Sequence, residues 1–112
     1  MMNGVNRTTE HEAVVARLWR EHLRAPFPAG LRGAEPAGID MVPLDTDIAG
    51  RVSTWRSNGT TLDTQRLRIL RDCVADLDQV LPLLTDTEDL RYWQRLRQLA
   101  QFVSDAGPQP TE

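Results

Sequence analysis

The side chains that could do chemistry gather around the first proline-rich stretch of the chain. His22 and Arg24 close a predicted helix, and Asp40, Asp45 and Asp47 follow beyond the prolines. An imidazole can accept a proton, a guanidinium can bind a carboxylate or phosphate, and paired carboxylates can hold a divalent cation. We expect contacts to a ligand or partner, if the chain makes them here, to involve these residues.

Structural roles account for the same residues. His22 lies near Trp19 and Leu23 at helical spacing, which is typical of a packed histidine. Asp45 and Asp47 suit the start of a helix, where a carboxylate caps free amides and the helix dipole favours negative charge. We therefore assign no catalytic residue.

Motifs for metals, nucleotides and activated nucleophiles are missing from the sequence. His11 and His22 would lie about 16 Å apart on one helix, too far to share a metal ion. The chain contains no HExxH, no CxxC, no glycine-rich phosphate loop and no Gly-x-Ser-x-Gly. Cys73 has no histidine nearby and adjoins an apolar stripe, so it is interpreted as a small core residue. We predict no metal and no cofactor, and binding rather than catalysis.

Length and charge narrow the class of protein. The 112 residues suit one helical domain, with flexible tails at 1–7 and 106–112 and a long linker at 25–44. All 13 basic residues are arginine, yet the net charge is −3, which makes nucleic acid an unlikely partner. No stretch is apolar enough for a secretory signal or a membrane span. With its single cysteine, the chain is expected in the cytoplasm.

Hydrophobic periodicity predicts four helices. The strongest signal is an alternation of three and four residues that puts six apolar side chains on one helix stripe: Leu67, Leu70, Val74, Leu77, Leu81 and Leu84. The helices are predicted at about 9–24, 45–58, 64–84 and 86–104, with a capping box at 9–12. A short extended segment is predicted near 39–44, where Pro43 would confine any strand to a sheet edge.

The last two helices are predicted to form an antiparallel hairpin about residue 85. Folding the chain there brings arginines of the last helix level with aspartates of the third. The predicted pairs are Arg91 with Asp78, Arg95 with Asp76, and Arg97 with Asp72. Because its apolar stripe is wide, the last helix is expected to touch both the first and the third.

Two runs of the sequence resemble a known group of proteins. They are Leu18-Trp19-Arg20 through Pro26-Phe27-Pro28, and Leu44-Asp45-Thr46-Asp47-Ile48-Ala49-Gly50. These runs are similar to small uncharacterised actinobacterial proteins, whose later part resembles residues 62–82. The resemblance covers about residues 14–104 and implies no activity, so it transfers no catalytic residue. Members often have a cysteine at the position of Arg51, which this chain lacks.

Three hypotheses about function follow. The first is a non-enzymatic helical module for protein–protein interaction, which could pair with itself as a two-fold homodimer through Leu67, Leu70, Val74 and Leu77. The second is a DNA-binding regulator, because the second and third predicted helices loosely resemble a helix-turn-helix whose second helix contains Arg66 and Arg68. The third is an enzyme or small-ligand protein with a site at the 25–47 linker.

Overall fold

The computed structural model describes residues 7–31 and 33–106, and within these ranges the chain folds into four α-helices linked by short 3-10 turns. The α-helices are α1 (Arg7–Arg24), α2 (Met41–Ser57), α3 (Thr64–Val80) and α4 (Thr87–Asp105). The 3-10 turns are η1 (Ala29–Leu31), η2 (Pro36–Gly38) and η3 (Leu81–Leu83). The prediction of a mainly helical fold with four helices is confirmed.

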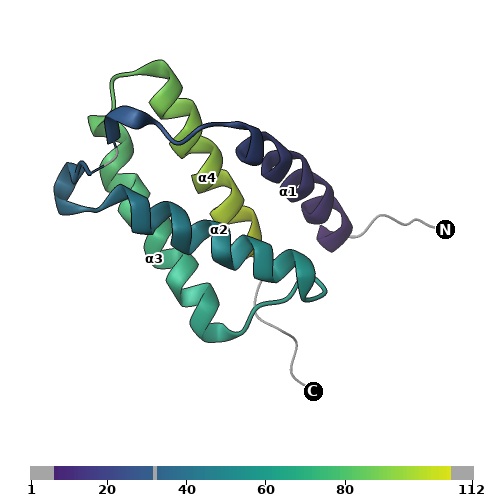
Figure 1. Ribbon diagram of the computed structural model, residues 1–112. Coiled ribbons are helices and arrows are strands. Elements are labelled where there is room, and N and C mark those ends of the chain that lie inside the picture. The colour runs from purple at the N-terminus through teal and green to yellow at the C-terminus, as the bar shows by residue number, and fades with distance from the viewer. Residues whose placement is uncertain (1–6, 32, 107–112) are drawn as a thin grey trace.

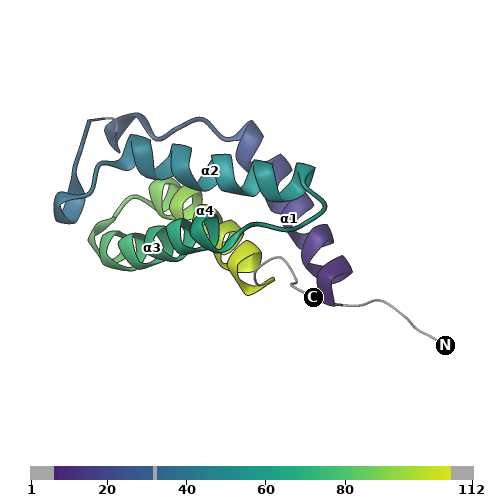
Figure 2. The same cartoon turned by 90° about the horizontal axis from the view of Figure 1, so that it is seen from below.

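Helix α4 is the element on which the other helices pack. It contacts α1, α2 and α3, while α2 and α3 also pack against each other. Figure 1 shows the linker after α1 crossing the first turns of α4, and Figure 2 shows α2 covering one side of the α3–α4 pair. The expected neighbours of the last helix, α1 and α3, are both found, and α2 is a third.

The core is made of the apolar faces of all four helices. Trp55 and Trp93 are among its largest fully buried side chains, whereas Trp19 is half-buried at its edge. The buried face of α3 includes Cys73, whereas Val74 of the predicted stripe is only partly buried. Leu23 was placed on the apolar face of the first helix, and this was wrong, since its side chain is 67% exposed.

Helix α1 begins at Arg7, two residues before the predicted start. The residue that caps it therefore lies outside the described part of the chain, and so does the side chain of Thr9 in the predicted capping box. Its end at Arg24 agrees with the prediction, because Pro26 and Pro28 follow and cannot continue a helix.

The extended segment predicted near 39–44 was wrong beyond its first two residues. Helix α2 begins at Met41, with Asp40 as its N-cap, and the Asp40 carboxylate accepts a hydrogen bond from the Val42 amide at 3.3 Å. Pro43 therefore lies in the first turn of α2. A proline there costs little, because amides of the first turn have no partner within the helix. Asp45 and Asp47 lie inside the helix rather than at its start.

The turn after α2 is closed by a glycine cap. Gly59 adopts a φ of 68°, and the Thr60 amide donates to the Trp55 carbonyl at 2.8 Å. A left-handed residue followed by this backward hydrogen bond is the usual way to satisfy carbonyls at a helix end. The turn redirects the chain so that Asp63 can cap α3 by accepting from the Arg66 amide at 2.8 Å.

Helix α3 ends earlier than its apolar stripe suggested. It stops at Val80, and Leu81–Leu83 form a 3-10 turn that contains Pro82. A proline in the helix interior would clash with a carbonyl one turn back, so the helix tightens before it. Leu81 and Leu84 still pack against the core, whereas Leu83 is 56% exposed.

The hairpin forms, but with a different alignment from the predicted one. Arg97 was expected opposite Asp72, and instead its Nε lies 2.7 Å from Asp78 Oδ1, six residues further along α3. The longer connection, with η3 inside it, carries the start of α4 past the end of α3 by roughly 10 Å. The first turns of α4 thus project beyond α3 (Figure 1) and face the linker.

The buried position of the α3 stripe leads to a stability prediction. Leu77→Ala should lower the free energy of unfolding by roughly 2–5 kcal/mol, because the fully buried side chain would leave a cavity. Leu83→Ala is the matched control and should cost less than about 0.5 kcal/mol, since Leu83 is exposed. Urea denaturation measures both. Equal losses for the two variants would contradict the described core.

Candidate functional site

The structure separates the five predicted contact residues into three places. His22 and Asp45 come together inside the molecule, with Nε2 of the histidine 3.4 Å from Oδ1 of the aspartate. Arg24 is exposed at the end of α1. Asp40 and Asp47 lie on α2 at the side facing α3, and Asp47 pairs with Arg51 at 3.6 Å. No single site contains all five.

Tyr92 joins His22 and Asp45 in a buried cluster. Its hydroxyl donates to Asp45 Oδ2 at 2.5 Å, and its ring centroid lies 5.1 Å from that of His22. The three side chains come from α1, α2 and α4. Burial, followed by the hydrogen bond to Asp45, raises the pKa of Tyr92, so the phenol remains a donor. The cluster connects three helices through polar groups at the edge of the core.

Phe27 connects the same cluster to the linker. Its ring meets Tyr92 and Trp93 edge to face, with centroids 5.8 and 5.7 Å away. Pro26 and Pro28 on either side restrict the backbone to a non-helical path, so the phenylalanine can reach back onto α4. Such aromatic contacts stabilise by roughly 0.5–1.5 kcal/mol beyond the area they bury. They hold the linker against the first turns of α4.

The His22–Asp45–Tyr92 arrangement resembles a catalytic unit only in composition. The side chain of His22 is 9% exposed, and its Nδ1 is buried without a hydrogen-bond partner among the described residues. Neither His22 nor Asp45 lines the pocket described below. A general base must reach the proton that it removes, and these side chains face the protein interior. The contacts of the cluster pack α1, α2 and α4 against one another.

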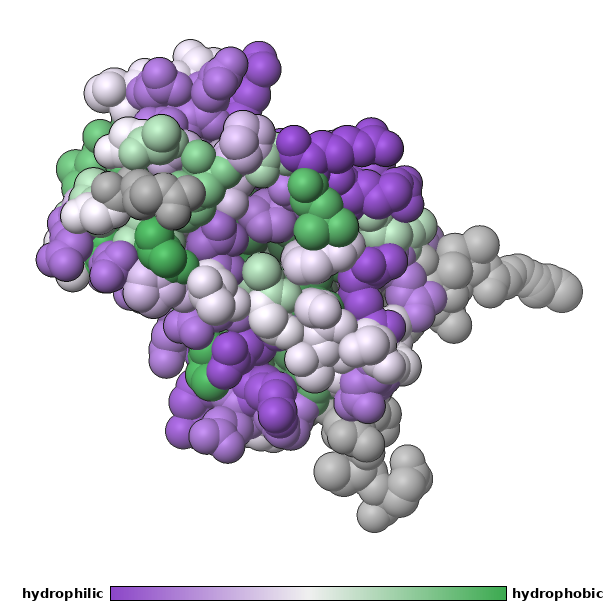
Figure 3. Space-filling view, viewed as in Figure 1, coloured by the Kyte–Doolittle hydropathy of each residue, from purple (hydrophilic) through white to green (hydrophobic). Residues whose placement is uncertain are grey.

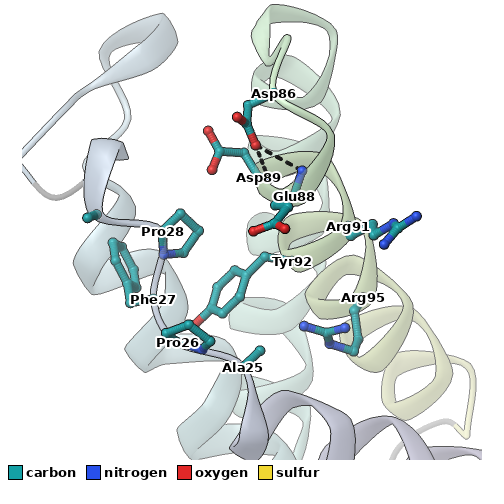
Figure 4. Close-up of a pocket in the computed structure, with 11 residues that line it drawn as sticks. Ala25, Pro26, Phe27, Pro28, Asp86, Glu88, Asp89, Arg91, Tyr92 and Arg95 are labelled. Carbon is teal, nitrogen blue, oxygen red and sulfur yellow. Dashed lines mark hydrogen bonds between the residues drawn. The ribbon is translucent and has the colours of Figure 1, made fainter.

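A pocket of about 500 Å³ lies between the linker and the projecting turns of α4. One wall is the segment 25–29, which contributes two prolines and Phe27, and the other is α4 from its N-cap to its third turn. Figure 4 shows Tyr92 between these walls. The lining residues are Ala25, Pro26, Phe27, Pro28, Ala29, Asp86, Glu88, Asp89, Arg91, Tyr92 and Arg95. Of the predicted 25–47 linker site only residues 25–29 line this pocket, and none of the five predicted contact residues does.

Carboxylates crowd the N-terminal end of this pocket. Asp86 caps α4 by accepting from the amides of Glu88 and Asp89 at 2.9 and 3.1 Å. Burial and the charges of Asp86 and Glu88 raise the pKa of Asp89. A helix N-terminus favours negative charge, yet it does not outweigh these effects at Asp89. This end of the pocket is electrostatically suited to a cation.

The opposite end of the pocket is basic. The Arg95 guanidinium lies 5.9 Å from the centroid of the Tyr92 ring, a cation–π distance. Its Nε is buried and has no hydrogen-bond partner among the described residues. In Figure 4, Arg95 lies on the far side of Tyr92 from the carboxylates, and Arg91 extends outward. A pocket with acids at one end, an arginine at the other and aromatic rings between can bind a dipolar group.

A second, smaller hollow of about 310 Å³ lies between α2 and α3. Asp40, Asp47 and Asp76 line it together with Cys73. Burial, followed by the charges of Asp47 and Asp76, raises the pKa of the Cys73 thiol to about 12. A thiol in such surroundings is a poor nucleophile. The sequence interpretation of Cys73 as a small core residue agrees with its burial.

The predicted interface on α3 is not open to a partner. Leu67, Leu70 and Leu77 are buried in the core of this chain, and Val74 is half-buried against it. The exposed large apolar side chains among the described residues are instead Leu23, Val42 and Leu83, one each on α1, α2 and η3. Figure 3 shows a largely hydrophilic face with small, separate hydrophobic areas.

Sequence analysis missed the residues that form the pocket. Phe27 was visible between its two prolines, and the charges at 86–95 were visible along α4, but nothing in the sequence paired the two segments. Tyr92 is buried, with 5% of the residue exposed, and was not predicted as a contact residue. Its position beside Trp93 was the one local signal that this side of α4 is aromatic.

The hydrogen bond between Tyr92 and Asp45 should contribute measurably to stability. Tyr92→Phe should lower the free energy of unfolding by roughly 1–3 kcal/mol, because it leaves a largely buried carboxylate without its donor. In an Asp45→Asn background the same change should cost less, since the unpaired charge is gone. Urea denaturation of the four proteins gives the coupling. Equal costs in both backgrounds would mean that the bond contributes nothing.

The thiol of Cys73 should resist alkylation in the folded protein. At pH 9, the ordinary pKa for this group, half of an unfolded thiol is ionised, whereas a pKa of about 12 leaves about one in a thousand as thiolate. Iodoacetamide should therefore react roughly 500-fold more slowly with the folded than with the urea-unfolded chain. Mass spectrometry over time measures both rates, and similar rates would contradict the described burial.

Comparisons with protein-family models, with curated proteins and with solved structures gave no match. Among residues 7–31 and 33–106, no helix is both long and apolar enough to cross a membrane. In the same ranges, no group of three or more histidine, cysteine, aspartate or glutamate side chains is arranged to hold a metal ion.

Proposed function

We propose that this protein is a non-enzymatic helical module that binds a segment of another protein in the pocket between residues 25–29 and α4. The observation that carries the proposal is the pocket itself, with its proline and aromatic wall and its charged ends. A hollow of about 500 Å³ is within the size range of ligand sites. It suits a few side chains of a partner rather than a broad interface.

The chemistry of the pocket supports binding over catalysis. Tyr92 supplies the one hydroxyl among the lining residues, and it donates inward to Asp45. The lining includes no histidine, serine or cysteine, and of its three carboxylates Asp86 is engaged in capping α4. Prolines and aromatic rings, by contrast, are common in surfaces that recognise peptides.

The fold gives less support to the other hypotheses about function. The Arg66 guanidinium, proposed for DNA contact, pairs with the Asp63 carboxylate that caps its own helix, and the net charge is −3. A homodimer would have to use a surface other than the buried α3 stripe. We also propose a cytoplasmic location, because Cys73 is a free thiol. The resemblance to actinobacterial proteins stays a prediction.

Selection from an unbiased peptide library displayed on phage tests the proposed function. Peptides enriched on the wild-type chain should lose at least about tenfold in affinity for Ala29→Trp, because the indole would fill the pocket that Ala29 lines. Fluorescence anisotropy with the enriched peptides measures the affinities. Ala75→Trp is the matched control, since Ala75 is exposed on α3, outside the pocket lining, and should bind normally.

Light scattering on a sizing column identifies the alternative in which the partner is a second copy. A dimer that Ala29→Trp dissociates and Ala75→Trp does not would place a second chain in the pocket. The proposed function fails if selection enriches no peptide and the mass is that of a monomer at all concentrations. It also fails if enriched peptides bind Ala29→Trp as well as they bind the wild type.

A further inference from the structure

We infer that the pocket recognises an extended partner segment that carries one basic and one acidic side chain three positions apart, with an apolar residue between them. This inference rests on the proposed function and names the chemistry of the partner. The juxtaposition behind it is the placement of Glu88 and Asp89 at one end of the pocket and Arg95 at the other, with Tyr92 between (Figure 4).

The acidic end lacks a basic partner within the chain. No ion pair among the described residues joins Glu88 or Asp89 to an arginine or histidine. In Figure 4 the Glu88 carboxylate points toward the middle of the pocket, while Asp86 is engaged by the amides that it caps. Burial, followed by the negative charges of Asp86 and Glu88, raises the pKa of Asp89. A lysine or arginine of the partner would neutralise it.

The basic end lacks an acidic partner in the same way. Arg95 was predicted to pair with Asp76, yet no ion pair involving Arg95 occurs among the described residues. One face of the guanidinium is occupied by the Tyr92 ring, and the buried Nε has no acceptor. A guanidinium held by an aromatic ring presents a fixed fork, which suits a carboxylate.

The distance between the two ends sets the spacing in the partner. Glu88 and Arg95 are two turns apart on α4, about 10 Å along the helix axis. In an extended chain, residues three positions apart are separated by about 10 Å. The partner's charged residues would therefore meet both ends if the segment lies along α4 in extended form.

The middle of the pocket favours an apolar residue in the partner. The Tyr92 and Phe27 rings lie edge to face with centroids 5.8 Å apart, and Pro26 and Pro28 continue the wall that Phe27 begins. Burying an aliphatic side chain against these groups supplies the affinity that solvent-exposed ion pairs do not. The charged side chains at the two ends of the pocket then determine which partner segments bind.

Synthetic peptides with a fixed Pro-Leu centre test the inference. The probes are Lys-Pro-Leu-Glu, Glu-Pro-Leu-Lys, Lys-Pro-Leu-Lys, Glu-Pro-Leu-Glu and Gln-Pro-Leu-Gln, each fluorescently labelled through the same flexible linker. One of the two mixed-charge peptides should bind the wild type roughly three- to tenfold more tightly than every other probe. The double variant Glu88→Arg/Arg95→Glu should prefer the mixed-charge peptide of the opposite order, because the charged ends have changed places.

Variants that neutralise one charged side chain at a time show which end of the pocket recognises which residue of the peptide. Glu88→Gln should weaken only the preference for the basic residue, and Arg95→Gln only that for the acidic residue. Asp72→Asn and Arg68→Gln make matched charge changes at exposed positions of α3 and should leave both preferences intact. Thermal melting confirms that every variant is folded, so lost preference reflects lost contact.

Three results would overturn the inference. They are equal binding of all five probes, tightest binding of a single-sign probe, or an unchanged order of preference in the double variant. Absence of binding by every probe overturns it as well. These four results differ from a failure of the proposed function. Library peptides that lack the charge pattern but still compete for the pocket lined by Ala29 would support the proposed function and refute this partner chemistry.

Discussion

The position of Tyr92 determines how the other elements meet. Its ring contacts His22 of α1 and Phe27 of the linker, and its hydroxyl donates to Asp45 of α2. One side chain of α4 thus contacts α1, α2 and the linker. Because polar bonds depend on direction while apolar packing does not, the Tyr92–Asp45 bond helps to fix how α2 lies against α4.

The pocket is a consequence of this arrangement. Phe27 must lie on Tyr92 and Trp93 for the linker to follow α4, and the prolines beside it keep the chain from coiling back into a helix. The linker therefore forms a wall at a set distance from α4. The charged side chains of α4 line the space between because they lie on the same projecting turns as Tyr92.

Local patterns predicted the helices well and their ends less well. The apolar spacing of α3 could be recognised in the sequence, because it depends on neighbours within one or two turns. Pro43 contributed to the wrong prediction of an extended segment, because proline is compatible both with an edge strand and with a first helical turn. The alignment of α3 with α4 was wrong because it depends on the path of residues 81–86, which periodicity does not describe.

The residues of the pocket were not predictable from the sequence, although the linker that forms one of its walls was expected to carry a site. Two of the five predicted residues, His22 and Asp45, do meet, but inside the protein and through Tyr92. The pocket depends on contacts between segments more than 55 positions apart, such as Phe27 with Trp93. Residue types in one sequence carry no information on such pairings unless a known motif links them.

The projection of α4 past the end of α3 has a consequence for how this protein could diversify. The packed interior lies between the four helices, whereas the pocket lies between the linker and the turns of α4 that extend past the end of α3. Changes in the length of the 25–40 linker or the 81–86 connection could therefore reshape the recognition surface while the packed interior stays the same. Such variation would be confined to the connecting segments, because Phe27 and Tyr92 both line the pocket and pack the helices together.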